Sequence, residues 1–386
     1  MISFFLLILI INEFETKIIE KGTFTVLQDK INTLTDHQLD LDQDYIFKLD
    51  KDKIGGIIIN KSLIIVGQNH EINGLNQSKL FEISNTDVIL KNINFINGFS
   101  EDFGGAINLI NSSLEINNCS FSYNNAYING GSINLINSSL NITQCIFKFN
   151  SAKGLYSSGG GISSENSKIN IEKSFFFNNS ADEGGAIYII NSLLDIYTSK
   201  FYNNNANWYG GSLLSDSQLS IYNSNFSNNK AGYKGGSIHT TKSAFAKDSF
   251  LIINNTIMFN NNAEYGGVIS TSNLQYAYIY NSEIFNNQAS FDFVISRMSG
   301  NNIKIIISSC YNNKSIKGGI LFSLAGGNNS FINDKFKNNK ADIGGLIFTI
   351  SGRVSNQVTK FSPNFINCNL TDNFGKKGLI YWFLMN

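Results

Sequence analysis

The sequence contains very little proline and few charged residues. Pro363 is the single proline among 386 residues, which fits a fold in which most backbone N–H groups donate to a neighbouring segment. Charged residues make up 15 % of the chain and their formal sum is zero. This balance shows neither the basic footprint of a nucleic-acid-binding protein nor an acidic tail. No nucleic-acid partner is therefore expected.

Cysteine and histidine are also scarce. The four cysteines include no C-x-x-C pair, and no Cys/His spacing is typical of a zinc site. The three histidines, His37, His70 and His239, are far apart in the sequence. We therefore expect no metal and no cofactor.

Long apolar runs are absent after the first residues. Residues 1–11, MISFFLLILII, are of signal-peptide length and too short to span a bilayer. Residues 1–16 are therefore interpreted as a signal peptide, with a buried strand at the end of the fold as the alternative. No other segment reaches transmembrane length. Asn-x-Ser/Thr sequons, such as those at Asn60, Asn141, Asn225 and Asn369, are compatible with a secreted or surface protein.

A repeated unit occupies most of the chain. The stretch 184–206, GGAIYIINSLLDIYTSKFYNNNA, reads as a Gly pair, a short apolar strand, Leu-x-Ile, Ser-x-Phe and an Asn-rich turn. The Gly pair recurs with a period of about 26 residues, which is typical of a solenoid. The pairs begin at Gly104, Gly130, Gly159, Gly184, Gly210, Gly235, Gly266, Gly318 and Gly344, and a degenerate copy, DFVI, begins at Asp292.

Alignment of the copies gives vertical columns. Leu-x-Ile and Ser-x-Phe alternate with period two, the pattern of strands with one inward face, and no window has a sustained helical period. Each copy therefore predicts three short strands, stacked on those of the next copy. The aromatic column contains Phe95, Phe121, Phe147, Phe176, Phe201, Phe226, Met258, Ile284, Cys310 and Phe336.

Asparagine and glycine mark the expected corners. An Asn column runs from Asn124 to Asn339 at the repeat period. Asparagine tolerates left-handed backbone, and stacked amides can bond one another in a ladder. The Gly pairs would supply positive φ at the next corner.

The repeat resembles a known family. GGAI followed by L-x-I and F-x-x-N is similar to the repeat of chlamydial polymorphic outer membrane proteins, and more broadly to the pectin-lyase-like right-handed parallel β-helix. The resemblance covers about residue 55 to the C-terminus. It implies a single all-β domain, a right-handed parallel β-helix with three strands per coil. This scaffold carries both enzymes and adhesins, so the resemblance alone does not fix an activity.

The expected domain organisation has three parts. A signal peptide (1–16) precedes an N-terminal cap (17–54), in which Phe24, Leu27 and Ile31 have the spacing of a short helix. A β-helix of roughly ten coils (55–386) follows. Because the last residues carry no polar cap, either the C-terminus is incomplete or something else covers the final coil.

Two insertions interrupt the period. They lie at 152–159 and 238–251, and loops that vary on a rigid scaffold are common binding sites.

One pair of cysteines is a candidate disulfide. Cys119 and Cys145 are one period apart, so stacking would bring them close to disulfide geometry. The alternative is a pair of buried thiols.

Aromatic residues before the Gly pairs form the candidate binding site. They would either line one edge of the rod, where exposed Trp and Tyr suit sugar rings or protein partners, or pack over the Gly corners and shield them. These residues are Tyr156, Trp208, Tyr209, Tyr233 and Tyr265.

Catalytic motifs are not found. The sequence has no Asp-Asp pair, no Gly-His-Gly and no Arg-x-Lys, whereas glycoside hydrolases need paired carboxylates and lyases of this scaffold use carboxylates with a base. Acidic residues such as Asp182 and Glu183 precede some Gly pairs. The expected function is a non-catalytic extracellular or cell-surface rod that binds glycans or cell-surface proteins. The alternative is a polysaccharide lyase or glycoside hydrolase.

Overall fold

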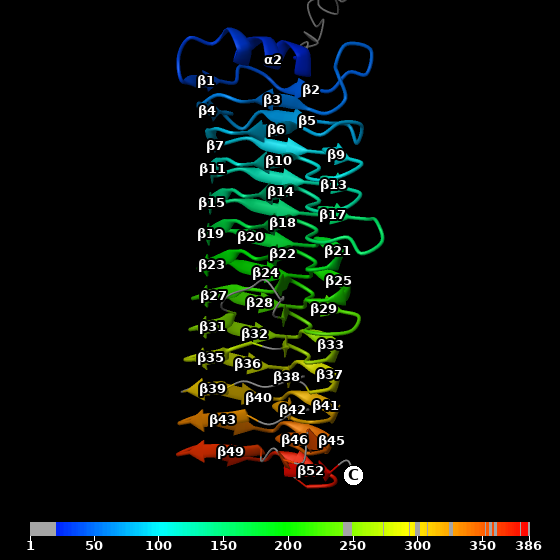
Figure 1. Cartoon of the computed structure of the whole chain (residues 1–386), viewed down its shortest axis with the longest axis vertical. Helices are drawn as coiled ribbons and strands as arrows, with labels where there is room; N and C mark the ends of the chain where they lie inside the picture. The colour runs from blue at the N-terminus through cyan, green and yellow to red at the C-terminus, as the bar shows by residue number, and fades with distance from the viewer. Residues whose placement is uncertain are drawn as a thin grey trace, which may run out of the picture.

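The computed structural model shows an elongated stack of coils that carries one short helix at its N-terminal end (Figure 1). The N-terminal segment interpreted as a signal peptide lies outside the described residues, as does most of the insertion at 238–251. The structure describes residues 21–241, 249–272, 274–292, 294–297, 302–306, 308–323, 327–351, 353–354, 357–358, 361–378 and 380–384.

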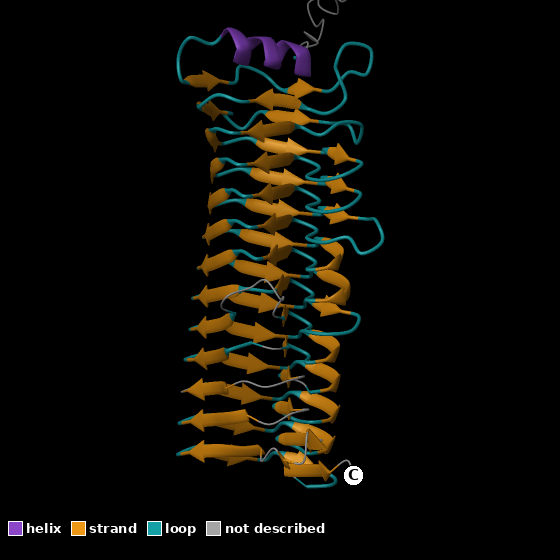
Figure 2. Ribbon diagram, in the orientation of Figure 1, coloured by secondary structure: helices purple, strands orange, loops and turns teal. Residues whose placement is uncertain are grey.

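Each coil contributes one strand to each of three sheets, and most coils add a strand to a fourth. All ladders between coils are parallel and join each strand to its equivalent in the next coil (Figures 1 and 2). We number the sheets in the order in which a complete coil visits them.

Sheet 1 holds the Leu-x-Ile strands: β1 (Gln38–Asp40), β4 (Leu63–Val66), β7 (Asp87–Lys91), β11 (Ser113–Asn117), β15 (Ser139–Thr143), β19 (Lys168–Glu172), β23 (Leu193–Tyr197), β27 (Gln218–Tyr222), β31 (Phe250–Asn254), β35 (Tyr276–Tyr280), β39 (Asn302–Ile306), β43 (Gly327–Ile332) and β49 (Phe361–Ile366). Sheet 2 holds the Ser-x-Phe strands: β2 (Tyr45–Ile46), β5 (Glu71–Asn73), β8 (Asn94–Ile96), β12 (Ser120–Ser122), β16 (Ile146–Lys148), β20 (Phe175–Phe177), β24 (Lys200–Tyr202), β28 (Asn225–Ser227), β32 (Ile257–Phe259), β36 (Glu283–Phe285), β40 (Ser309–Tyr311), β44 (Lys335–Lys337) and β50 (Asn369–Thr371).

Sheet 3 follows the Asn-rich turn: β9 (Phe99–Ser100), β13 (Asn125–Ala126), β17 (Ser151–Ala152), β21 (Ser180–Glu183), β25 (Asn205–Tyr209), β29 (Lys230–Ala231), β33 (Asn262–Tyr265), β37 (Gln288–Phe291), β41 (Lys314–Lys317), β45 (Lys340–Ile343) and β51 (Phe374–Gly375). Sheet 4 follows the Gly pair: β3 (Ile57–Ile59), β6 (Phe81–Ser84), β10 (Ile107–Ile110), β14 (Ile133–Ile136), β18 (Ile162–Glu165), β22 (Ile187–Ile190), β26 (Leu213–Ser215), β30 (Ile238–Thr240), β34 (Ile269–Thr271), β38 (Ile295–Arg297), β42 (Leu321–Ser323), β46 (Ile347–Ser351) and β52 (Ile380–Leu384). A small antiparallel hairpin joins β47 (Arg353–Val354) to β48 (Gln357–Val358).

The expected all-β parallel β-helix is confirmed, with three differences in detail. The described residues place 13 strands in each of sheets 1, 2 and 4, more than the roughly ten coils expected. The coils also start inside the segment 17–54 expected to be the cap, because β1 and β2 already pair with β4 and β5. Sheet 3 is a fourth ladder that the three predicted strands per copy did not include.

The cap is the helix α2 (Phe24–Thr33), which has the predicted helical spacing. Thr23 caps its N-terminus by accepting a hydrogen bond from the Val26 N–H. Phe24, Leu27 and Ile31 are buried against the first coils, so the helix covers the upper end of the stack. No helix among the described residues is long and apolar enough to cross a membrane.

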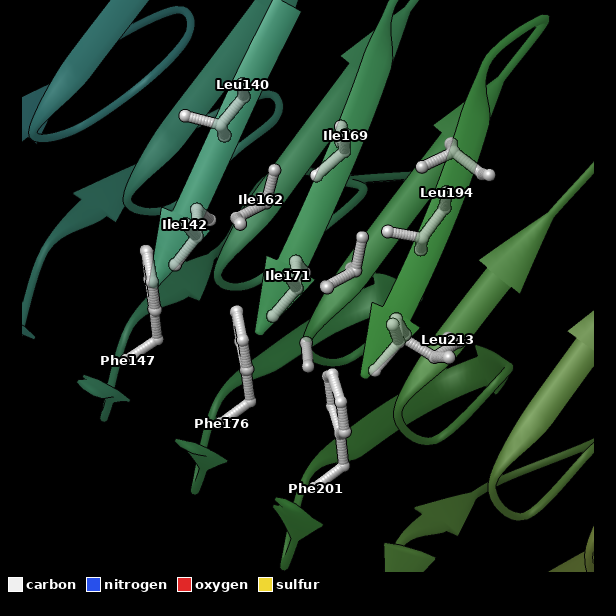
Figure 3. Close-up of a cluster of buried hydrophobic side chains, with 14 of the residues drawn as sticks. Leu140, Ile142, Phe147, Ile162, Ile169, Ile171, Phe176, Leu194, Phe201 and Leu213 are labelled. Atoms are coloured by element: carbon white, nitrogen blue, oxygen red, sulfur yellow. The ribbon is translucent and has the colours of Figure 1, made fainter. Parts of the chain in front are cut away.

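The interior consists of stacked columns, as the repeat predicts. Phe147, Phe176 and Phe201 are fully buried, and their rings stack nearly parallel with centroids 4.6 and 4.8 Å apart (Figure 3). The column continues in register through Met258, Ile284 and Cys310 to Phe336. Each coil therefore buries its apolar side chains against the equivalent side chains of the coils above and below.

Four left-handed corners turn each coil from Asn85 to Gly210. Around β23–β26 they are Asn191, Thr198, Asn203 and Gly210, with φ between 47° and 64°. Glycine is required at the last corner, because a Cβ on Gly210 would lie 2.1 Å from the Leu213 carbonyl oxygen.

The two expected roles of asparagine fall on neighbouring residues. Asn203 adopts the left-handed turn, whereas the buried Asn204 forms the ladder. Its Nδ2 donates to the Phe176 carbonyl at 2.9 Å and to Asn229 Oδ1 at 3.1 Å. Its Oδ1 accepts from both the backbone N–H and the Nδ2 of Asn179. Every hydrogen-bonding atom of this buried amide is therefore satisfied.

The small-residue column forms a second ladder that includes a carboxyl group near its C-terminal end. The backbone N–H of each member donates to the side chain of the next, as from Ser174 to Ser199 at 3.0 Å. In one of the last coils the acceptor is Asp334, which receives the Ser308 N–H at 2.7 Å. Burial raises the pKa of Asp334 to about 6.

Replacement of Asn204 by alanine is expected to lower the free energy of unfolding by about 3 kcal/mol or more, since it leaves buried partners above and below without hydrogen bonds. Asn203→Gly is the matched control, because glycine suits the left-handed corner. Urea denaturation of both variants measures the difference. Equal midpoints would show that the amide ladder does not stabilise the stack.

Asp334→Asn is expected to remove one component of the pH dependence of stability. Because the folded pKa of Asp334 lies above its ordinary value of 3.8, its stabilising contribution is complete below about pH 4 and is lost as the pH rises through 6. The variant should therefore gain on the order of 2 kcal/mol over the parent between pH 4 and pH 7. Denaturation at several pH values tests this, with the exposed Asp87→Asn as control. A constant offset between parent and variant would contradict the assignment.

Candidate binding surface

The five aromatic residues expected to form an edge strip divide into two groups. Tyr209, Tyr233 and Tyr265 are half-buried and in contact with one another, whereas Tyr156 and Trp208 are 79 % and 50 % exposed. Among the described residues no aromatic ring packs against either exposed side chain. The sequence left binding and shielding open as two roles; the contacting group has the packing expected for shielding, and the other group has the exposure that binding would need.

The contacting residues form a ring cluster at the junction of sheets 3 and 4. The Tyr209 and Tyr233 centroids are 5.8 Å apart and those of Tyr233 and Tyr265 are 5.3 Å apart, both edge-to-face. Phe291 stacks on Tyr265 at 4.6 Å, and His239 stacks on Tyr209 at 5.1 Å. The three tyrosines lie one or two residues before the Gly corners of successive coils, and their packing against one another is what the shielding role predicts.

A lysine lies within the ring cluster. Lys234 Nζ is 5.0 Å from the centroid of Tyr233 and 6.0 Å from that of Tyr209, within the range of cation–π attraction. Burial lowers the pKa of Lys234 and raises that of Tyr209. Burial, followed by the charge of Lys234, lowers the pKa of His239 to about 3, so this imidazole is neutral near pH 7.

The sequence missed Lys234, Phe291 and His239. The sequence could have predicted Phe291, because this residue directly precedes DFVI, the degenerate copy of the Gly pair. In register, however, Tyr209 is followed by Lys234 and then Tyr265, so Lys234 and not Tyr233 is the equivalent residue. His239 carried no signal, since only the coil-to-coil packing places its ring on Tyr209.

Trp208 is exposed because it lies at a bulge. Between the pairs Ala181–Ala206 and Glu183–Tyr209, β25 contains one more residue than β21. Such an extra residue redirects side chains. Trp208 remains tied to the frame through its carbonyl oxygen, which accepts the N–H groups of Tyr233 and Lys234 at 2.9 and 3.0 Å.

Asp182 connects the two exposed aromatic residues. Its carboxylate accepts the Tyr156 N–H at 2.8 Å and the Asn207 side-chain amide at 2.7 Å. Tyr156 and Trp208 therefore lie on coils two apart, about 10 Å along the rod. We call this pair of exposed aromatic residues, with Asp182 between them, the aromatic edge.

A groove begins one coil beyond the aromatic edge and runs over sheet 3. It has a volume of about 830 Å³. Its charged lining consists of Lys230, Glu264, Lys314 and Asp342, and the amide of Gln288 lies between them. Asp342 forms an ion pair with Lys376 at 2.9 Å. A second groove, of about 640 Å³, covers earlier coils and includes Tyr123, Phe149 and several asparagines.

The rings in that second groove present their edges. Tyr123 and Phe149 are 50 % and 40 % exposed, but they stack with centroids 5.0 Å apart and planes 4° apart. Each covers a face of the other, so a sugar ring has less room to stack there than on Trp208.

Carboxylates gather around Tyr188 on the outer face of sheet 4. Burial raises the pKa of Tyr188 to about 12, helped by the charges of Glu183, Asp216 and Glu165. Burial and the charge of Asp182 also raise the pKa of Glu183. No described Lys or Arg forms an ion pair with these acids, and no group of three described His, Cys, Asp or Glu side chains is close enough to hold a metal ion.

The cysteine pair is present as two buried free thiols rather than the disulfide alternative. The Cys119 N–H donates to Cys145 Sγ at 3.4 Å, which places both residues in the small-residue ladder. Burial raises the pKa of the Cys119 thiol.

Comparisons of the chain with protein-family models, with curated proteins and with solved structures found no match.

Tyr265→Ser and Trp208→Ser are expected to affect stability differently. Loss of the Tyr265 ring removes contacts with Tyr233 and Phe291 and should cost about 1–2 kcal/mol. Loss of the exposed Trp208 ring should cost no more than about 0.5 kcal/mol. Thermal denaturation measures both. A larger loss for Trp208→Ser than for Tyr265→Ser would contradict the division into packed and exposed groups.

Proposed function

We propose that this chain is a non-catalytic extracellular or cell-surface rod that binds glycans through the aromatic edge and the adjoining groove. The observation that carries the proposal is Trp208, a half-exposed indole held at a bulge beside an open polar groove. Exposed Trp and Tyr faces beside amide and charged groups are suited to sugar rings. The apolar run at residues 1–11 supports export.

The scaffold supports this role through its rigidity. Asp182 accepts hydrogen bonds from the Tyr156 backbone N–H and from the side chain of Asn207, the residue before Trp208. Trp208 itself is held by two backbone hydrogen bonds from the next coil. Binding groups that are already ordered lose little conformational entropy when a ligand binds.

The second candidate is an enzyme that acts on polysaccharides. It is favoured by one observation, the pKa of Glu183, which burial and the charge of Asp182 raise above its ordinary value, because a carboxyl group with a raised pKa is better suited to act as a general acid. In that case the protein would hydrolyse or cleave the glycan bound in the groove, and new reducing ends would be released.

The double variant Tyr156→Ser/Trp208→Ser is expected to lose at least about tenfold in affinity for the bound glycan, since it removes both open aromatic faces. A glycan array followed by titration calorimetry on the best ligand measures this, and reducing-end release is followed in the same samples. Tyr123→Ser is the matched control, because that exposed ring is already stacked on Phe149.

Two results would overturn the proposal. Equal binding by the parent and the double variant would exclude the aromatic edge as the site. Reducing-end release that disappears in Glu183→Gln would establish the enzyme instead.

A further inference from the structure

Sheet 1 lies at the side of the rod opposite to sheet 3 (Figure 1). Its outer face carries an aromatic patch. Burial alternates along its strands, so the first, third and fifth residues point outward. On β23, β27, β31, β35 and β39 many of these residues are aromatic or aliphatic. The outward apolar residues are Leu193, Tyr197, Tyr222, Phe250, Ile252, Tyr276, Tyr278, Tyr280 and Ile306.

The patch is partly open to solvent. Tyr197 and Tyr278 are 40 % and 37 % exposed, and a shallow cavity of about 310 Å³ lies between Tyr278, Tyr280, Lys304 and Ile306. A contiguous apolar face of this kind on a parallel sheet is commonly covered by another element or by a partner.

Charge is divided along the rod. Residues 21–249 contain 17 basic and 20 acidic residues, and residues 250–386 contain 11 basic and 6 acidic residues. These two parts therefore have net charges of −3 and +5. Because the chain advances steadily along the rod axis, this difference becomes an acidic N-terminal half and a basic C-terminal half, and an antiparallel neighbour would match each half with its opposite.

The patch repeats this asymmetry. Asp195 and Lys304 occupy the same third position on β23 and β39, two strands to either side of β31. Neither forms an ion pair with a described residue. Each is an unpaired charge at the margin of an apolar face.

We propose that the outer face of sheet 1 is a self-association surface on which a second copy of this chain packs antiparallel, about a two-fold axis that follows β31. Rotation about the strand direction keeps the position along the strand, so first positions face first positions and third positions face third positions. Strand β23 then faces β39 of the second copy, and β27 faces β35.

This register gives complementary pairs. Asp195 faces Lys304, and Ser220, a small residue, faces the larger Tyr278. Tyr197 faces Ile306, and the Tyr222 ring faces that of Tyr280. The other two-fold arrangement, with parallel rods, would place the two acidic halves together and the two basic halves together, which like-charge repulsion disfavours.

The size of the contact indicates a reversible dimer. The overlapping strands of sheet 1, nine on each copy, would cover roughly 40 Å by 16 Å at ordinary strand spacing. This is at the lower end of stable interfaces. Since sheets 1 and 3 lie on opposite sides, the dimer would leave both aromatic edges and both grooves free.

Charge reversal tests the proposal. Asp195→Lys and Lys304→Asp, each alone, are expected to weaken dimerisation about tenfold or more. Each substitution places two like charges opposite one another at both ends of the interface. The double variant restores the opposite-charge pairs and is expected to dimerise within a few-fold of the parent. Sedimentation equilibrium over a concentration series at low salt measures the dissociation constants.

A charge reversal at the equivalent position of another sheet 1 strand is the control for general effects of net charge. Glu115→Lys changes an outward third position on β11, outside the overlap, and should leave dimerisation unchanged. Thermal denaturation of all variants checks that the fold persists. A monomeric parent at every concentration, or single reversals that leave the dimer intact, would overturn the proposal. So would a monomer whose glycan binding is lost in Tyr278→Ser, since the patch would then be a ligand surface.

Discussion

The structure depends on register between successive coils. Every coil hydrogen-bonds to the next through parallel ladders, and left-handed corners return the chain to the same place after each circuit. A shift of one residue in a strand would turn its buried side chains toward water, as with the phenylalanine column of sheet 2. The repeated Asn ladder helps to fix this register, because the amide of Asn204 reaches partners in both adjacent coils. Stacking, amide bonding and corner geometry therefore depend on one another.

Such an interior leaves the outer surface free to vary. Inward positions repeat the same few residue types, whereas outward positions on sheets 1, 2 and 3 change from coil to coil. The bulge that exposes Trp208 and the aromatic patch around Tyr278 occur on an almost unchanged frame. Outer surfaces on opposite sides of the rod can therefore differ in character without disturbing the core, which is the usual separation between scaffold and site in solenoids.

Buried polar groups show where the repeat has been altered. Asp292 takes the place of the first glycine of a pair, keeps its left-handed φ of 59° and is fully buried. Burial raises its pKa well above the usual range for a carboxyl group. Asp334 replaces serine in the small-residue ladder and still accepts the expected N–H. These substitutions retain the local geometry and change the ionisation chemistry.

The sequence alone determined the repeat, the inward columns and the helical cap, because in-register stacking converts a period in sequence directly into contacts in space. Tertiary structure decided the features that depend on short or irregular pairing. The strands of sheet 3 are as short as two residues, too few for a period to appear. Three features depend on a one-residue offset between neighbouring coils. They are which asparagine forms the turn and which forms the ladder, whether Tyr233 or Lys234 continues the column, and whether Trp208 is exposed. Such an offset is set by backbone pairing across coils, and no local pattern within one copy records it.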